Sequence, residues 1–150
     1  MTNASSARAQ PAPRSEYRVF RPISTRWMDN DVYGHVNNVV YYSYFDTVIN
    51  RYLIAEGGLD IANGLEIGLC VESQCHYRRP LTFPEPVAAG LRVGKLGTSS
   101  VRYELALFAG DEVEAAADGH FVHVFVDRTT RRPTPIPDRM RSALARLLRA

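Results

Sequence analysis

The sequence is poor in the features that mark secreted, membrane-spanning or polyanion-binding proteins. Its 150 residues hold only two cysteines, Cys70 and Cys75, with no metal-ligand pattern around them. No apolar run approaches the roughly 20 residues of a transmembrane helix, and the first residues lack the apolar centre of a signal peptide. A formal net charge of only +2 provides no large field for a polyanion. We therefore expect a cytoplasmic protein with reduced thiols, whose partners include neither nucleic acid nor membrane.

The length and composition predict one ordinary soluble domain. A hydrophobic content of 45% with 23% charged residues is typical of a globular chain rather than a disordered one. The beginning differs, because Ser, Ala, Pro and Arg dominate residues 1–14. We predict a disordered tail at residues 1–14 and a single domain at residues 15–150.

The most informative stretch is a polar loop that leads into a long apolar helix, at residues 26–53. Asn37 or Asn38 is a suitable N-cap, and the pair Gly57-Gly58 predicts the helix end near Glu56. At about 100° per residue, the helix has one narrow polar stripe and is apolar over most of its circumference. The stripe consists of Ser43, Asp46, Thr47 and Asn50. Such a helix is buried on several sides, and we expect a sheet to curve around it.

The rest of the chain supplies that sheet. Strands are predicted at residues 17–27, 67–79, 87–96, 99–108 and 113–127. Pro22 predicts an edge position or a bend, because proline cannot donate to a strand ladder. A short helix at residues 138–149 has one apolar face and is expected to dock on its own domain. The predicted class is α+β, with a long central helix wrapped by a curved antiparallel sheet of about five strands and a short C-terminal helix.

Simple alternation along residues 67–79 predicts which side chains share a face. It places the apolar residues on one face and the polar residues on the other. The apolar set is Ile67, Leu69, Val71, Cys75 and Tyr77. The five-residue spacing of Cys70 and Cys75 puts the two thiols on opposite faces, so we expect no disulfide between them.

The loop also carries a resemblance to a known family. The run Asp31-Val32-Tyr33-Gly34-His35-Val36-Asn37-Asn38, followed by Tyr41 and Phe45-Asp46, resembles the hotdog-fold acyl-CoA thioesterases. Within them it is similar to the 4-hydroxybenzoyl-CoA thioesterase group, with its YbgC-like and FadM-like enzymes. Tyr77-Arg78-Arg79-Pro80-Leu81 and residues 96–101 also resemble later strands of that family. The resemblance covers roughly residues 17–128 and implies the hotdog fold.

The resemblance implies roles for individual residues. Asp31 would be the catalytic carboxylate, as nucleophile or general base, and the Asn38 N–H at the helix start would polarise the thioester carbonyl. Physical chemistry favours the same arrangement, because free N–H groups at a helix start can stabilise an oxyanion. The expected substrate-binding residues are Tyr33, Gly34, His35, Asn37 and Tyr41, and the expected CoA-binding residues are Arg78, Arg79, Lys95, Ser99 and Ser100. The substrate is an acyl-CoA, no metal or cofactor is expected, and a homodimer or homotetramer is implied.

Other residues could take the catalytic role, and other functions fit the same residues. Asp46 is the main rival to Asp31, because a second branch of hotdog thioesterases takes its carboxylate from the helix; a solvent or subunit contact is the favoured role for it. Asp29 is expected to face solvent. The alternative functions are an (R)-specific dehydratase or hydratase using His35 and Asp46, and a non-catalytic acyl-CoA-binding module. The sequence leaves open the acyl group and the choice between CoA and an acyl carrier protein.

Overall fold

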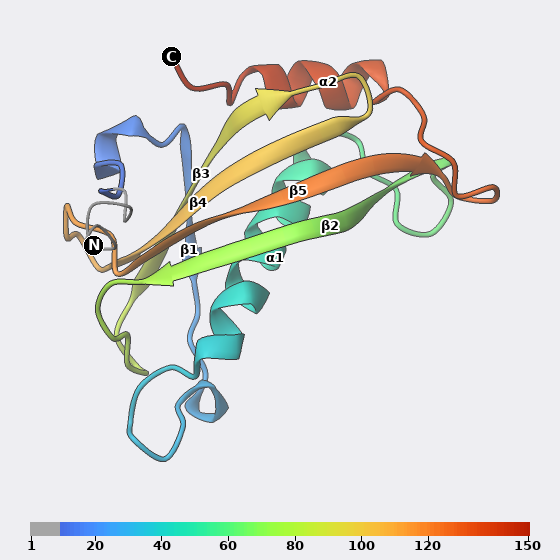
Figure 1. Cartoon of the computed structure of the whole chain (residues 1–150). Helices are drawn as coiled ribbons and strands as arrows, with labels where there is room; N and C mark the ends of the chain where they lie inside the picture. Colours follow the sequence, from blue (N-terminus) through green and yellow to red (C-terminus); the bar gives the residue numbers. More distant parts are fainter. Residues whose placement is uncertain (1–9) are drawn as a thin grey trace, which may run out of the picture.

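A five-stranded antiparallel sheet curves around one long helix (Figure 1). The structure is a computed structural model that describes residues 10–150. Its elements in chain order are η1 Arg14–Glu16, β1 Val19–Ile23, η2 Trp27–Asp29, α1 Asn38–Ala55, β2 Glu66–Tyr77, β3 Val87–Leu96, β4 Ser100–Ala109, β5 Ala117–Asp127 and α2 Asp138–Ala145. The strand order in the sheet is β1-β3-β4-β5-β2. The predicted α+β class and the predicted order of elements are confirmed.

Local signals in the sequence set both ends of α1. The Asn37 side chain accepts the Val39 N–H at the N-terminus, and Gly58, with φ of +74°, follows the C-terminus. The buried side of the helix packs against the inner face of the sheet and consists of Tyr41, Tyr44, Phe45, Val48, Ile49, Tyr52 and Leu53. The polar stripe lies on the other side, where Asp46 and Thr47 are exposed. The predicted cap and the predicted burial are both confirmed.

The first strand is an edge strand, as Pro22 predicts. It is shorter than expected, because β1 ends at Ile23 and the chain then turns into η2. Pro22 lies opposite Ala88 of β3, and among the strands of residues 10–150 only β3 is a neighbour of β1. The missing proline N–H therefore costs no hydrogen bond in the interior of the sheet.

The segment before β1 lies against the outer face of the sheet. A small apolar cluster there contains Tyr17 and Phe108, with Ala12 packed against it. Arg14 donates hydrogen bonds to the carbonyls of Gly110 and Glu112, at 3.0 and 2.8 Å. Of the predicted disordered tail, residues 1–9 lie outside the described residues, and residues 10–14 belong to this packed segment.

A β-bulge in β2 changes the predicted faces of that strand. The register with β5 shifts between Cys70 and Glu72. Before the bulge, Leu69 lies opposite Val124, which points away from the core; after it, Cys75 enters the core. The prediction that Ile67, Leu69 and Val71 share a face with Cys75 and Tyr77 is therefore wrong. An extra residue in a strand reverses the alternation from that point onward.

The same bulge places both cysteine side chains on one face of the sheet. Cys70 lies opposite His123 and Cys75 opposite Gly119, four residues apart on β5, so both thiols point to one face. The expectation of opposite faces is wrong, although both cysteines are free. Cys70 is exposed and Cys75 is buried.

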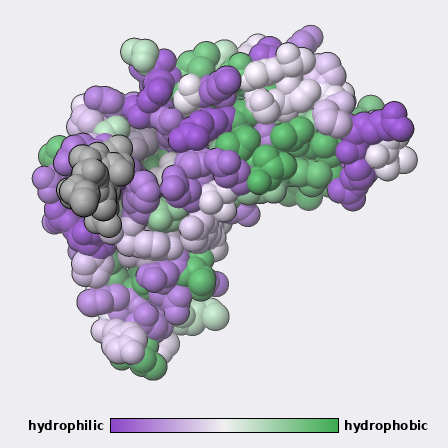
Figure 2. Space-filling model, viewed as in Figure 1, coloured by the Kyte–Doolittle hydropathy of each residue, from purple (hydrophilic) through white to green (hydrophobic). Residues whose placement is uncertain are grey.

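Hydrophobic side chains gather on the outer face over the first half of β2 and the second half of β5, which lie side by side (Figure 2). Leu69 and Val71 are 36% and 60% exposed there, which follows from the bulge that turns this part of β2 outward. Strand β2 is also an edge strand, so one of its sides carries free N–H and C=O groups. This combination is typical of a surface that another chain covers.

Helix α2 docks on its own domain, as predicted. Met140, Ala143 and Leu144 are buried, and the Tyr52 hydroxyl of α1 donates to the Ala143 carbonyl at 2.6 Å. No helix within residues 10–150 is long and apolar enough to cross a lipid bilayer.

Candidate active site

The loop between η2 and α1 is closed on itself and holds Asp31 near its tip. Asn30 and Val36 form an isolated antiparallel bridge, and the Asp31 N–H donates to the His35 carbonyl at 2.9 Å. The Asp31 side chain accepts the Tyr33 N–H at 2.9 Å, and this Asx-turn hydrogen bond stabilises the turn. Among residues 10–150, no donor is bonded to the other carboxylate oxygen, and Asp31 is partly exposed.

The start of α1 presents a free backbone donor beside this loop. The Asn37 N–H donates to the Asp29 carbonyl at 2.8 Å, and the Val39 N–H is taken by the Asn37 side chain at 3.1 Å. Within residues 10–150, no protein acceptor lies within hydrogen-bond reach of the Asn38 N–H. Such an unsatisfied N–H, at the positive end of the helix dipole, is suited to bind a carbonyl oxygen that gains negative charge.

One cavity of about 550 Å³ joins these two groups. Its lining residues are Asp31, Tyr33, His35, Val36, Asn38, Tyr41, Tyr77, Arg78, Arg79 and Pro80. Both predicted catalytic residues therefore lie on one cavity, together with three of the five predicted substrate-binding residues and two of the predicted CoA-binding residues. The other two substrate-binding candidates, Gly34 and Asn37, belong to the same loop but do not line the cavity. Gly34 has φ of +83°, which favours glycine at this turn.

Tyr77 is a cavity residue that the sequence-based prediction missed. Its hydroxyl donates to the Asn38 carbonyl at 3.1 Å, and its ring lies edge-on to the Tyr41 ring with centroids 5.0 Å apart. Desolvation raises the pKa of both phenols above the ordinary value of about 10, which already keeps a phenol protonated at neutral pH. The signal in the sequence was its place at the end of a strand, directly before Arg78, Arg79 and a proline-rich connection.

The two arginines at the cavity are paired with carboxylates. Arg78 forms a bidentate ion pair with Asp118, with hydrogen bonds of 2.8 and 3.3 Å. Arg79 forms ion pairs with Glu112 and with Glu114, the second at 2.9 Å. The Arg79 side chain is 40% exposed. These carboxylates offset part of the positive charge that a phosphate group would use.

The other predicted CoA-binding residues, Lys95, Ser99 and Ser100, belong to the β3–β4 hairpin. This hairpin lies at the end of the sheet opposite to the C-terminal end of β2 (Figure 1). Tyr77, which lines the cavity, lies opposite Ala117, and Ala117 lies opposite Leu107 near the end of β4. From that end, β3 and β4 stay paired up to the hairpin that contains these three residues. Ten residues of strand span about 30 Å. Within one chain, the structure does not bring them together with Arg78 and Arg79.

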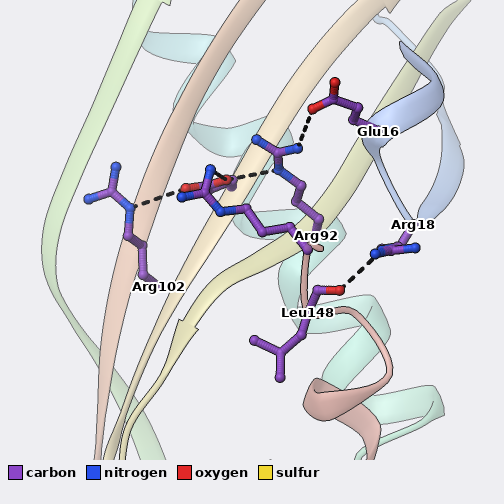
Figure 3. A network of polar contacts seen from close by, with 7 residues as sticks. Glu16, Arg18, Arg92, Arg102 and Leu148 are labelled. Atoms are coloured by element: carbon purple, nitrogen blue, oxygen red, sulfur yellow. Dashed lines mark hydrogen bonds and ion pairs between the residues drawn. The ribbon is translucent and has the colours of Figure 1, made fainter. Parts of the chain in front are cut away.

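Further arginines on the outer face of the sheet form an internal network (Figure 3). The buried Arg92 guanidinium lies 2.8 Å from Glu104 and 3.2 Å from Glu16. Arg102 lies 3.5 Å from the same Glu104. This network holds the segment before β1 against β3 and β4, and it is separate from the cavity.

Asp29 is buried, so the expectation that it faces solvent is wrong. Its side chain is fully inaccessible and accepts hydrogen bonds from the Tyr44 hydroxyl at 2.6 Å and from the Arg26 N–H at 2.9 Å. The turn η2 places Asp29 on the side of the loop that faces α1, a direction that residue spacing alone did not predict. Burial alone would raise the pKa of Asp29, but these hydrogen bonds outweigh it and lower the pKa below its ordinary value.

Asp46 lies apart from the cavity. It is exposed on α1 and accepts a hydrogen bond from the Asn50 side chain at 3.1 Å. Eight residues separate it from Asn38, which corresponds to about 12 Å along a helix axis. His35 lines the cavity and Asp46 does not. Among residues 10–150, no three or more His, Cys, Asp or Glu side chains are grouped so as to hold a metal ion.

Comparison with known proteins identifies several relatives. A model of the thioesterase-like superfamily matches residues 25–144. The crystal structure of the PA5185 protein of Pseudomonas aeruginosa PAO1 is 56% identical, with 95% of this chain and 99% of that chain covered and a TM-score of 0.92. A thioesterase from Thermus thermophilus, crystallised with coenzyme A and Zn, is 30% identical over 88% of this chain and 95% of its own, with a TM-score of 0.73. The YsmA protein of Bacillus subtilis is 25% identical over 88 residues, and the match spans 59% of its length.

Proposed function

The chain belongs to the thioesterase-like superfamily and is a thioester hydrolase of the hotdog fold, and from this premise we propose that it hydrolyses an acyl-CoA to the free acid and CoA. One observation carries the proposal: Asp31 and Asn38 line the same cavity, and the Asn38 N–H has no hydrogen-bond partner among the described residues. Thioester hydrolysis needs a group that delivers the attack and a donor for the developing oxyanion. Asp31 takes the first role and the Asn38 N–H the second.

Two routes lead from Asp31 to the same products. As a nucleophile, the carboxylate adds to the thioester carbonyl, the C–S bond breaks, CoA leaves as the thiolate and takes up a proton, and water hydrolyses the mixed anhydride. As a general base, Asp31 takes a proton from water while the resulting hydroxide adds to the carbonyl, and the same C–S bond breaks. Single-turnover hydrolysis in ¹⁸O-water separates the two, because only the nucleophile route can place the label in the Asp31 side chain.

Coenzyme A is the proposed carrier of the acyl group. The related thioesterase from Thermus thermophilus binds coenzyme A, and Arg78 and Arg79 stand at the cavity of this chain. Guanidinium groups suit phosphate recognition, although both arginines are also paired with carboxylates. No residue of the cavity belongs to a metal-binding group among the described residues, and the proposed chemistry uses no step that requires a metal.

We also propose a homodimer formed through β2. Two β2 edge strands that pair antiparallel about a two-fold axis would satisfy their free backbone groups and cover Leu69 and Val71. This arrangement would bring the start of the partner's β2 beside the Tyr77 end of this one. Because Ser100 and Leu69 lie opposite the same residue of β5, Val124, the hairpin of one chain would approach the cavity of the other. Light scattering after size exclusion tests this, since a monomeric mass at micromolar concentration contradicts it.

A thiol-release assay tests the function. Acyl-CoAs of increasing chain length and aryl-CoAs are offered to the wild type and to Asp31→Asn. We expect thiol release by the wild type on at least one substrate, and a loss of about 10²-fold or more in Asp31→Asn, because a catalytic group is removed. Absence of thiol release from every thioester, with binding retained, would favour the non-catalytic module. Hydration of an enoyl-CoA without thiol release would favour the hydratase.

A further inference from the structure

A buried carboxylate lies two residues before Asp31 and takes no part in the proposed chemistry. Asp29 is fully inaccessible, while its neighbours Trp27 and Met28 are 80% and 73% exposed. We propose that Asp29 is a positioning residue, which fixes the Asp31 loop relative to the N-terminus of α1 and so sets the geometry of the reaction. This inference rests on the proposed function, because it presumes that Asp31 and the Asn38 N–H act together.

The Asp29 side chain joins the loop to the helix. On the side of the turn η2 that precedes the loop, Oδ2 accepts the Arg26 N–H at 2.9 Å and Oδ1 accepts the Arg26 Nε–H at 3.0 Å. On the helix side, Oδ2 accepts the Tyr44 hydroxyl at 2.6 Å. Tyr44 belongs to the second turn of α1, so one carboxylate connects the start of the loop to the body of the helix.

The Asp29 backbone holds the other end of the same loop. Its carbonyl accepts the Asn37 N–H at 2.8 Å, and the next residue, Asn30, forms the bridge to Val36. The loop that carries Asp31 therefore leaves Asp29 and returns to it. A displacement of Asp29 would move the Asp31 carboxylate and the helix N-cap with respect to each other.

The cost of burying this carboxylate indicates a specific role. A charged group without water must be hydrogen-bonded to be tolerated, and an apolar side chain would fill the same space without that desolvation penalty. Asp29 meets this requirement with three donors on its side-chain oxygens. A misplacement of about 1 Å between reacting groups can cost about 10²-fold in rate. By fixing the position of Asp31 relative to the Asn38 N–H, the buried Asp29 carboxylate would serve the reaction, which explains why a charged side chain occupies this site.

A matched pair of tyrosines allows this role to be separated from simple stabilisation. Tyr44 and Tyr52 both lie on α1, are 6% and 4% exposed, and donate a hydroxyl hydrogen bond of 2.6 Å. The acceptor of Tyr44 is Asp29, and the acceptor of Tyr52 is the Ala143 carbonyl of α2, away from the cavity. Tyr44→Phe and Tyr52→Phe therefore remove the same kind of bond from the same helix, but only the first loosens the Asp31 loop.

The experiment measures kcat and KM for both variants on an acyl-CoA that the wild type hydrolyses, with urea unfolding as a control. We expect Tyr44→Phe to lose about 10-fold or more in kcat with KM changed by less than about twofold, as for a geometric misplacement. Tyr52→Phe should keep the wild-type kcat. Asp29→Asn should show the same loss of kcat as Tyr44→Phe. If Asp29→Asn does not fold, the comparison of Tyr44→Phe with Tyr52→Phe still tests the positioning role.

Each outcome has a distinct meaning when Asp31→Asn is measured alongside. If Asp31→Asn loses activity while Tyr44→Phe keeps the kcat of Tyr52→Phe, the positioning role is overturned and the proposed function stands. A rise in KM alone in Tyr44→Phe also overturns the positioning role, because the bond then serves substrate binding. If Asp31→Asn keeps the wild-type rate, both proposals fail together.

Discussion

Mild acid should destabilise this protein through one buried histidine, His123. The side chain is 3% exposed on the inner face of β5, and its Nδ1 lies 3.1 Å from the hydroxyl of the fully buried Tyr103. Cys70 lies opposite it on β2, and the Phe125 ring packs 6.3 Å away. Burial among these uncharged groups lowers the pKa of His123 from 6.5 to about 4.

The direction of the effect follows from proton binding. Between pH 6.5 and about 4, the unfolded chain binds a proton at this imidazole and the folded chain does not, so stability falls as the pH falls. The contribution is fully present above pH 6.5. At about 1.4 kcal/mol per pKa unit, the gap between the two pKa values corresponds to about 3 kcal/mol lost by pH 4.

Urea unfolding of the wild type and of His123→Gln, from about pH 4 to pH 8, isolates this loss. Glutamine keeps a hydrogen-bonding group beside Tyr103 but does not titrate, and the carboxylates that also titrate in acid are common to both proteins. We expect the difference in unfolding free energy to be constant above pH 6.5. Below it, the wild type should lose up to about 3 kcal/mol relative to the variant. A difference that does not change with pH would refute the reasoning.

Two further substitutions test the elements around the site. Asn37→Ala removes the oxygen that accepts the Val39 N–H. We therefore expect the free energy of unfolding in urea to fall by about 1 kcal/mol and kcat to fall as well. An unchanged kcat would show that the N-cap does not influence the reaction. Gly119→Ala would place a Cβ atom against the Gln74 carbonyl oxygen, which is backbone and cannot rotate away. We expect a loss of about 1–3 kcal/mol as β2 shifts away from β5, and a wild-type urea midpoint would show that the strands have room.

The sequence predicted the parts of the fold that depend on local chemistry. The N-cap at Asn37, the glycines after α1 and the edge position of Pro22 each follow from what one residue type can do with its backbone. The burial of α1 follows from the narrowness of its polar stripe. These signals lie within a few residues of the feature that they determine, so they can be interpreted without the rest of the chain.

Other features depend on contacts between distant segments. The bulge at Cys70–Glu72 has no proline or glycine to mark it, and it exists only in the pairing of β2 with β5. The burial of Asp29 depends on Tyr44, which approaches only after α1 has packed. The same reason separates Lys95 from Arg78: both were expected near CoA, but strand length places them at opposite ends of the sheet.

The loop itself was predicted in more detail than its surroundings. Asp31, His35 and Asn38 were expected at one site, and all three line one cavity. Tyr77, which also lines that cavity, is the last residue of strand β2 and comes 39 residues after Asn38 in the chain. Sequence reasoning identified the chemical groups of one continuous segment, and it missed the residue that the fold brings to them.

A direct comparison of two aspartates tests the proposal that Asp31 is the carboxylate that drives hydrolysis. We measure kcat for Asp31→Asn and Asp46→Asn on the same acyl-CoA, with circular dichroism to verify that both variants are folded. We expect a loss of about 10²-fold or more in kcat for Asp31→Asn and a near wild-type rate for Asp46→Asn. A full rate in Asp31→Asn with a loss in Asp46→Asn would contradict it.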